Sequence, residues 1–145
     1  KVDGETIPGD TIPLNHPMSV TVPGAVDGWF KLHEKYGSLE MSKIFATGIE
    51  ICHEGFEINQ ELAQSLDIHQ SELGGQRSSV SFYKNLLPLT AGTHIRRVNL
   101  GKTLDLIANE GPDIFYKGEI ASSISEVVGG NISPQDLKNY SSQWI

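Results

Sequence analysis

The chain has 145 residues, a formal net charge of −7 and a pI near 5.1. Its length suits one domain with a sizeable core, and its 38% hydrophobic and 20% charged residues are typical of a folded globular protein rather than a disordered one. The acidic balance disfavours nucleic acid as a partner, the lack of an apolar run of about 18 residues disfavours a membrane span, and the single cysteine excludes an internal disulfide.

The first 22 residues predict an extended segment that leads into a strand. Prolines at positions 8, 13 and 17 oppose regular hydrogen-bonded structure before the strand. Val20 and Val22 then alternate with Ser19 and Thr21, which is the period of a strand with one buried face. No other stretch is a convincing partner, so we expect this strand to belong to a sheet outside the chain.

Two helices are predicted between residues 23 and 55. The first presents one apolar face, and Gly37 is expected to end it in a left-handed conformation. The second is the most regular helix of the sequence, and Gly55 is expected to stop it. The predicted inward positions are Val26, Trp29, Phe30, His33 and Tyr36 in the first helix and Met41, Ile44, Phe45, Gly48, Ile49 and Cys52 in the second.

A shorter helix and a long loop are predicted next. Asn59 is expected to cap a helix that turns Leu62, Ala63 and Leu66 inward and frays before Gly74. Residues 74–94 show only a brief apolar alternation, which proline and glycine interrupt, so they are predicted to be a loop.

The last part of the chain predicts further helices. Asn99 is expected to cap a helix that Gly111 ends, Asp113 to cap a single turn, and Ser133 to cap a final helix that begins with Pro134. A helix between the last two ends at a pair of glycines. The predicted inward residues are Leu100, Leu104, Ile107, Ala108, Ile120, Ile124, Val127, Val128, Leu137 and Tyr140.

These elements predict a mainly α fold. We expect five or six helices in an irregular orthogonal array, with the one N-terminal strand completing a sheet outside this chain. The predicted division is an extended segment with a strand over residues 1–22 and a helical domain over residues 23–145.

Five histidines could suggest a bound metal, but their spacing argues against one. No two of them are four residues apart, and Gly37 stands where a zinc-binding helix that begins with His33 needs its second histidine. We therefore expect no metal site. The five are His16, His33, His53, His69 and His94.

Other local patterns approach catalytic motifs without completing them. Gly101–Thr103 ends like a phosphate-binding loop, but Arg96 stands where that motif requires glycine. Ser81 and Lys84 have the Ser-x-x-Lys spacing of some acylating enzymes, with no supporting motif. Cys52 lies on a buried stripe without an electropositive neighbour, as expected of an inert core thiol. The sequence thus predicts no catalytic, cofactor-binding or metal-binding residue.

The segment NEGPDIFYKGEI, residues 109–120, places adjacent aromatics and carboxylates between two glycines. We expect Phe115 and Tyr116 to wedge between the flanking helices, with the tyrosine hydroxyl bonded to a backbone group. Burial of such a ring stabilises a fold by about 1.5 to 3 kcal/mol. The segment therefore predicts a structural joint rather than an active-site mouth.

Three stretches resemble the large-subunit region of the gamma-glutamyltranspeptidase family in the same order and at similar spacing. They are VPGAVDGWFKLHEKYGSLEMSKIFATGIEICHEGFEIN, AGTHIRRVNLGKTLDLIANEGPDIFYKGEIASSI and GGNISPQDLKNY. The likeness covers about residues 19–143. Its most telling pieces are Val22-Pro23-Gly24 with Gly28, Gly111-Pro112-Asp113 with Phe115-Tyr116 and Gly118, and Asp136-Leu137 with Tyr140.

The resemblance implies an N-terminal-nucleophile hydrolase with an αββα parent fold. Such a precursor cleaves itself, and the new terminal threonine of its small subunit attacks a gamma-glutamyl amide such as that of glutathione, with its own α-amino group as the base and no cofactor. The Thr-Thr-His of the cleavage site and the upstream Arg-Glu motif are absent from this sequence, and Thr93-His94 lies elsewhere in the family's pattern. We expect an inactive helical scaffold, exported with its parent, whose partners are the rest of the large subunit and the small subunit.

Two alternatives remain open at this point. A related acylase of the cephalosporin acylase type would have a similar helical region and accept a different acyl group. A free-standing, non-catalytic helical binding module is the alternative outside the enzymes.

Overall fold

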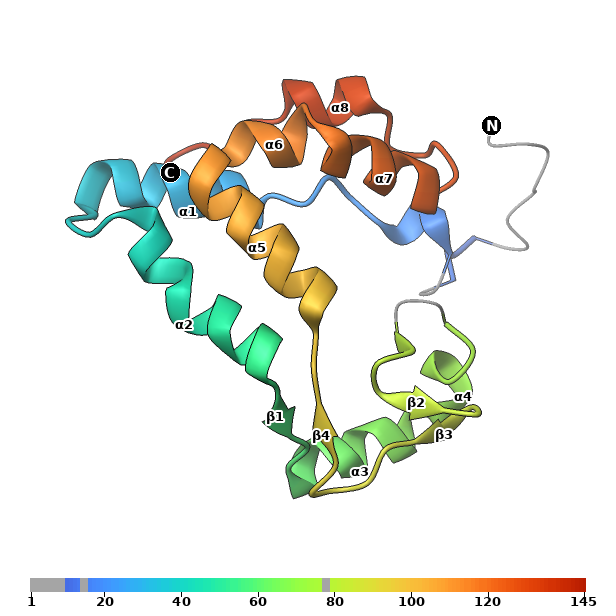
Figure 1. Cartoon of the computed structure of the whole chain (residues 1–145). Coiled ribbons are helices and arrows are strands. Elements are labelled where there is room, and N and C mark those ends of the chain that lie inside the picture. Colours follow the sequence, from blue (N-terminus) through green and yellow to red (C-terminus); the bar gives the residue numbers. More distant parts are fainter. Residues whose placement is uncertain (1–9, 14–15, 77–78) are drawn as a thin grey trace. The chain divides into compact units, whose positions relative to one another are not determined.

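The computed structural model describes residues 10–13, 16–76 and 79–145, and within them the chain packs as two compact units (Figure 1). Unit 1 comprises the described residues up to Met41 together with Leu106–Ile145, and unit 2 comprises Ser42–Asp105. The single fold unit expected from the chain length is thus replaced by two. The predicted division into residues 1–22 and 23–145 stays a prediction, since the packing divides the chain at other places.

Unit 1 is helical. It contains the 3₁₀ helix η1 (Pro17–Ser19) and the helices α1 (Ala25–Tyr36), α6 (Pro112–Tyr116), α7 (Glu119–Val127) and α8 (Pro134–Asn139), with the last turns of α5 (Val98–Glu110). Helix α6 contacts α1, α7 and α8, so this short helix lies at the centre of the unit (Figure 1). The buried apolar residues of the unit are Val26, Ile107, Tyr116, Ala121, Val128, Ile132 and Leu137.

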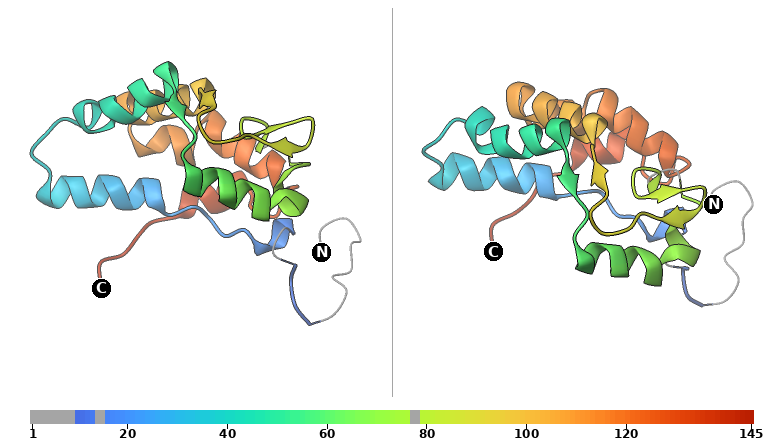
Figure 2. Two further views of the ribbon diagram at one scale, coloured as in Figure 1. Left: turned by 90° about the horizontal axis from the view of Figure 1, so that it is seen from below. Right: turned by 60° about the horizontal axis from the view of Figure 1, so that its bottom comes forward.

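Unit 2 combines helices with two small antiparallel ladders. Its helices are α2 (Met41–Glu54), α3 (Gln60–Ile68), α4 (Gln70–Leu73) and the first part of α5. Strand β1 (Phe56–Glu57) pairs with β4 (His94–Ile95), and β2 (Tyr83–Lys84) pairs with β3 (Leu87–Pro88). The right-hand view of Figure 2 shows β1 and β4 side by side where the chain leaves α2 and approaches α5.

A compact apolar cluster holds unit 2 together. Ile58 is 1% exposed and packs with Leu66, Tyr83 and Ile95. The Tyr83 hydroxyl donates to the carbonyl oxygen of Leu66 at 2.7 Å, so the one polar atom of this buried ring is satisfied. Burial raises the pKa of Tyr83, which keeps the hydroxyl protonated as a donor.

Several predicted helix boundaries are confirmed by their local geometry. The Asn59 side chain accepts from the Leu62 amide at 2.8 Å at the start of α3. Ser133 and Asp136 form a reciprocal capping box on α8, with proline in the first turn. Gly55 and Gly111 follow α2 and α5 with φ of +98° and +81°, a backbone region that glycine adopts without strain.

Other predicted boundaries are corrected. Gly37 has φ −74° rather than a left-handed conformation, and a Cβ there would meet the His33 ring, whose Nε2 lies 2.5 Å from the Leu39 carbonyl oxygen. The glycine therefore makes room for that ring. Asn99 and Asp113 lie inside the first turns of α5 and α6 rather than at their caps.

The strand and loop predictions also need correction. Residues 17–19 form η1, because Pro17 starts the turn and His16 Nδ1 accepts from the Met18 amide at 3.1 Å. Val20 is extended, but among the described residues 20–24 no ladder is formed. The predicted loop 74–94 instead contains β2, β3 and the start of β4, whose two-residue lengths leave too little periodicity to detect.

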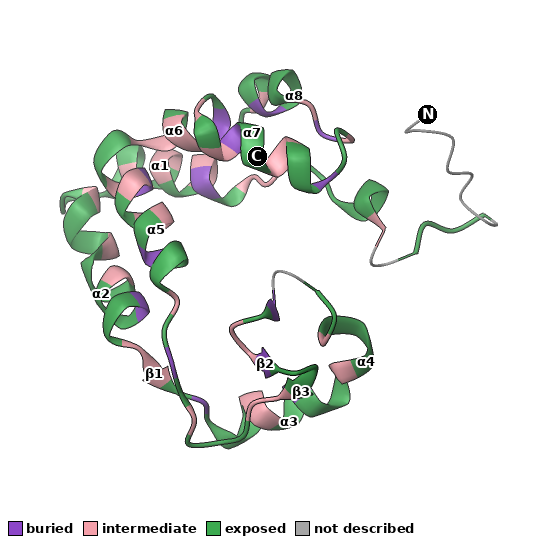
Figure 3. Ribbon diagram, turned by 45° about the vertical axis from the view of Figure 1, so that its right-hand side comes forward, coloured by how far each residue is buried: buried purple, intermediate pink, exposed green. Residues whose placement is uncertain are grey.

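Some residues that the apolar stripes place on the inner face of a helix are exposed in the structure. Figure 3 shows buried positions on α6 and α7 and mostly exposed positions on α3 and α4. Val127 was predicted inward and is 83% exposed, because α7 ends there and Val128 takes the buried place. None of the helices within the described ranges is long and apolar enough to cross a bilayer.

Leu137→Ala is expected to lower the free energy of unfolding by about 2–5 kcal/mol, because Leu137 is 0% exposed and its truncation leaves a cavity. Val127→Ala on the same unit is the control, and its effect should stay within about 0.5 kcal/mol. Urea unfolding followed by circular dichroism measures both. Equal losses for the two variants would contradict the assigned core.

Candidate functional site

The Tyr116 hydroxyl joins two parts of unit 1 that are far apart in the sequence. It donates to the Pro23 carbonyl oxygen at 2.7 Å and accepts from the Asp27 amide at 3.1 Å. Tyr116 is 4% exposed, and its ring contacts Phe115 edge-on at 4.9 Å. The predicted backbone partner of this hydroxyl is confirmed, and the joint fastens α6 to the first turn of α1.

The electrostatics of the joint suit a structural hydrogen bond rather than proton transfer. Burial raises the pKa of Tyr116, and the nearby charge of Asp27 raises it further. The phenol therefore remains protonated at neutral pH, which leaves it a donor to Pro23 and not a base.

A carboxylate and an amine on α1 hold the segment that follows α8. Asp27 Oδ2 accepts from the Ser142 amide at 2.6 Å and lies 3.1 Å from Lys31 Nζ. The same Lys31 Nζ donates to Ser141 Oγ at 2.6 Å and to the Ser142 carbonyl oxygen at 2.5 Å. Burial alone would raise the pKa of Asp27, but the bonds from Ser142 and Lys31 outweigh it, so the pKa is lowered.

Tyr140 completes the joint by stacking on Tyr116. The two rings lie 5.7 Å apart at an interplanar angle of 16°. A Cβ added to Gly24 would stand 2.1 Å from the Tyr140 hydroxyl oxygen, so only glycine permits this ring position. Three pieces of the sequence that carried the family resemblance, around Pro23-Gly24, Tyr116 and Tyr140, thus meet at one place.

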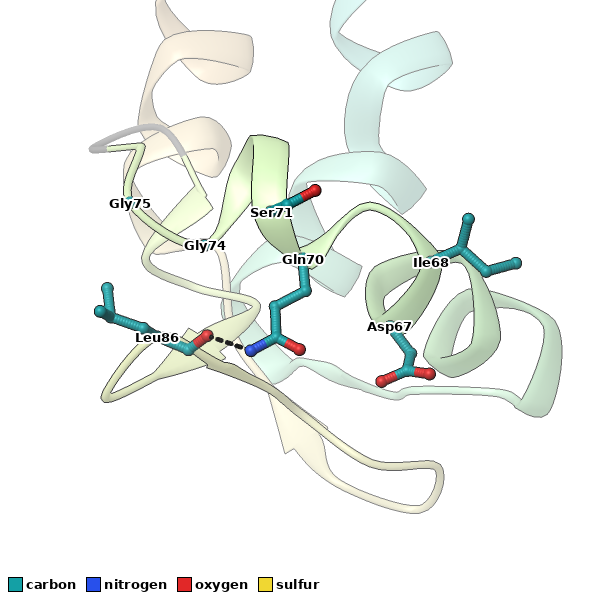
Figure 4. A pocket seen from close by; sticks show the side chains of 7 residues that line it. All are labelled: Asp67, Ile68, Gln70, Ser71, Gly74, Gly75 and Leu86. Carbon is teal, nitrogen blue, oxygen red and sulfur yellow. Dashed lines mark hydrogen bonds between the residues drawn. The ribbon is translucent and has the colours of Figure 1, made fainter.

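Unit 2 has an open pocket of about 500 Å³ between α3, α4 and the β2–β3 turn (Figure 4). The Gln70 amide reaches the Leu86 carbonyl oxygen at 3.1 Å, and the Asp67 carboxylate points to the same side. The pocket contains no histidine or cysteine among its described lining residues. These lining residues are Asp67, Ile68, Gln70, Ser71, Gly74, Gly75 and Leu86.

The five histidines are engaged at separate places rather than gathered. His69 Nδ1 lies 3.4 Å from Glu72 Oε2, and a Cβ on Gly101 would stand 2.9 Å from His53 Nε2. His94 pairs with Glu57 across the β1–β4 ladder. Within the described ranges, no group of three His, Cys, Asp or Glu side chains could hold a metal ion.

The incomplete catalytic motifs lie in structural positions. Cys52 is buried on α2, and its carbonyl oxygen accepts from the Arg97 amide at 2.9 Å. Gly101–Thr103 lies within α5, where Thr103 Oγ1 donates to the Asn99 carbonyl oxygen at 3.1 Å. Ser81 lies in a turn and Lys84 in β2, which does not place them on one helical face. Thr93-His94 forms backbone bonds to the β1 segment.

The sequence reading missed two features of these sites. Asp27 and Lys31 have the i, i+4 spacing of a helical ion pair, which could have drawn attention to them, but nothing local connects them to Ser142. Asn85 and Leu86 both have positive φ, at 52° and 67°, in a turn that the loop prediction did not resolve.

The model of the gamma-glutamyltranspeptidase family matches residues 3–145. The glutathione hydrolase proenzyme of Escherichia coli (strain K12) is 33% identical over 144 residues, which cover 96% of this chain and 25% of that protein. The chain thus spans about a quarter of the length of such curated relatives.

Solved structures agree with this match. The gamma-glutamyltranspeptidase of Helicobacter pylori is similar with a TM-score of 0.83 and 28% identity, covering 97% of this chain and 42% of that chain. The cephalosporin acylase of Bacillus halodurans is similar with a TM-score of 0.82 and 26% identity, covering 92% of this chain and 27% of that chain. The mainly α fold prediction and its link to N-terminal-nucleophile hydrolases are confirmed.

Tyr116→Phe is expected to lower the free energy of unfolding by about 1–3 kcal/mol, because the partly buried Pro23 carbonyl and Asp27 amide each lose a partner. Tyr36→Phe is the matched control, since Tyr36 is 67% exposed and its truncation should be nearly neutral. Chemical denaturation compares the two. A neutral Tyr116→Phe would show that the joint is not a stabilising contact.

Acid is expected to weaken the hold of α1 on the segment after α8. The lowered pKa of Asp27 means that its contribution is fully present above the ordinary aspartate range near pH 4 and is lost as the pH falls through the lowered value. Asp27→Asn should therefore reduce stability at pH 7 and flatten its decline in acid. Asp136, whose pKa Ser133 lowers, keeps a residual acid dependence in the variant. Unfolding midpoints from pH 2 to 7 test this, and unchanged slopes would refute it.

Proposed function

Because the chain belongs to the gamma-glutamyltranspeptidase family, we propose that it forms the helical scaffold of the large subunit of a gamma-glutamyltranspeptidase. The single observation that supports this role is the joint at Tyr116, where the segments that carry the family likeness converge on two backbone hydrogen bonds. A joint of this kind positions helices and performs no chemistry. Residues 23–145 are then the helical domain of that large subunit, and residues 1–22 are the segment that leads into it.

The parent protein, in this proposal, transfers or hydrolyses the gamma-glutamyl group of glutathione and related amides. A terminal threonine of the small subunit attacks the amide carbonyl, and its α-amino group takes up the hydroxyl proton. The C–N bond breaks, the departing amine receives that proton, and the resulting ester passes its acyl group to water or to an acceptor amine. The chain described here contributes none of these groups.

The partners and location follow from the same proposal. The rest of the large subunit and the small subunit of the same precursor are the partners, in keeping with the name proenzyme carried by the Escherichia coli relative. We place the protein outside the cytoplasm, in the periplasm or secreted, as the resemblance implies.

A related acylase is the second candidate. The TM-score of 0.82 to a cephalosporin acylase is nearly equal to the 0.83 to a gamma-glutamyltranspeptidase, so the helical fold supports both equally. The 33% identity to a glutathione hydrolase proenzyme favours the first. A non-catalytic binding module has no similar observation in its favour.

The full-length protein that contains this sequence is expected to cleave itself into two subunits and to hydrolyse a gamma-glutamyl anilide, while residues 1–145 alone release no anilide product. Gel electrophoresis and absorbance of the released amine measure the two events. A preference for another acyl group over gamma-glutamyl amides would favour the acylase, and lack of both cleavage and turnover would favour the binding module. Turnover by residues 1–145 alone would overthrow the scaffold role.

A further inference from the structure

The two-residue turn between β2 and β3 adopts a conformation that its sequence does not favour. Both turn residues have positive φ, 52° at Asn85 and 67° at Leu86. Hairpin turns of this kind favour Asn followed by Gly, and a bulky side chain at positive φ is an outlier. Asn85 fits its position, whereas Leu86 is strained.

Contacts from α3 and α4 fix this strained turn. Gln70 Nε2 donates to the Leu86 carbonyl oxygen at 3.1 Å. A Cβ on Gly74 would stand 3.1 Å from that same oxygen, so the end of α4 lies close against the turn. These contacts to the Leu86 carbonyl oxygen stabilise the strained conformation of the turn.

The strained backbone at Leu86 does not bury the Leu86 side chain among the described residues. Leu86 is 64% exposed, Leu87 is 61% exposed, and Ile68 at the adjoining pocket is 67% exposed. Figure 4 shows the Leu86 side chain directed away from Gln70. Strained residues persist where they serve a binding site, so an apolar side chain presented in this way indicates a contact outside the chain.

The charge around the turn indicates what kind of surface would fit. Asp67 lines the pocket next to Leu86. Burial is the main cause of the raised pKa of Tyr83, and the negative charge of Asp67 raises that pKa further. Among the described lining residues none is cationic. A lysine or arginine on the partner would therefore complement this rim.

We propose that Asp67, Ile68, Gln70, Leu86 and Leu87, here called the hairpin surface, form a docking surface for a segment of the same precursor that lies outside this chain. The segment places an apolar side chain against Leu86 and a lysine or arginine opposite Asp67. The inference rests on the proposed function, and relatives of which this chain covers 25% have ample polypeptide to supply the segment.

Two substitutions in the full-length protein separate docking from local strain. Asn85→Gly changes the turn residue that fits its position and leaves both the strain and the side chain of Leu86 in place, so its thermal midpoint should change little. Leu86→Asn relieves the strained position, since asparagine tolerates positive φ, but it removes the apolar contact. We expect its midpoint to fall by about 2 °C or more. An unchanged or raised midpoint for Leu86→Asn would overturn the proposal.

Thiol labelling identifies the occupant. In the native full-length protein, Leu86→Cys should react with a maleimide at least about tenfold more slowly than in the urea-unfolded protein, at every protein concentration. Rapid labelling, or protection that disappears on dilution as for a second copy, would each reject the docking segment. Hydrolysis of the gamma-glutamyl anilide by the unaltered protein tests the proposed function separately, because neither substitution touches the reacting groups.

Discussion

The hydroxyl of Tyr116 holds the Pro23 carbonyl and the Asp27 amide at once, and the order of unit 1 depends on this pair of bonds. The Tyr116 residue is 4% exposed, and its two hydrogen bonds lie in partly buried surroundings. The start of α1 is thereby fixed to α6, and Asp27 in turn fixes the segment after α8 through Ser142. The phenol bridges residues 93 and 89 positions apart, and Asp27 extends the connection to Ser142, which supports the proposed scaffold role.

The two units are stabilised by different means. Unit 1 relies on a polar joint surrounded by aromatic rings, whereas unit 2 relies on the apolar cluster of Ile58, Leu66, Tyr83 and Ile95 with two very short ladders. In both units a buried tyrosine hydroxyl bonds to a backbone carbonyl, and burial raises its pKa. These two tyrosines therefore remain protonated donors at neutral pH, in agreement with the proposed scaffold role.

The sequence predicted best what is decided locally. Asn59, Ser133 and the glycines after α2 and α5 set helix ends through their own side chains or backbone freedom, so pattern alone located them. The sequence did not predict features that depend on contacts between distant parts of the chain. The ladders of two residues have no readable period. Of the neighbours Val127 and Val128, both predicted inward, only Val128 is buried, while Val127 is 83% exposed. The bond from Ser142 to Asp27 joins residues 115 positions apart. At the joint, the aromatic pair was predicted, but its partners across the fold were not.

The tight approach of Tyr140 to Gly24 carries a consequence for how this family can diversify. Since a methyl group at position 24 would stand 2.1 Å from the phenol oxygen, the two sites are not free to change independently. Lineages that acquire alanine or serine at position 24 should show a smaller side chain at position 140, and the two columns of an alignment should covary. A side chain at position 24 therefore requires the ring at position 140 to shift or shrink, whereas a smaller residue at position 140 meets no such obstacle beside Gly24.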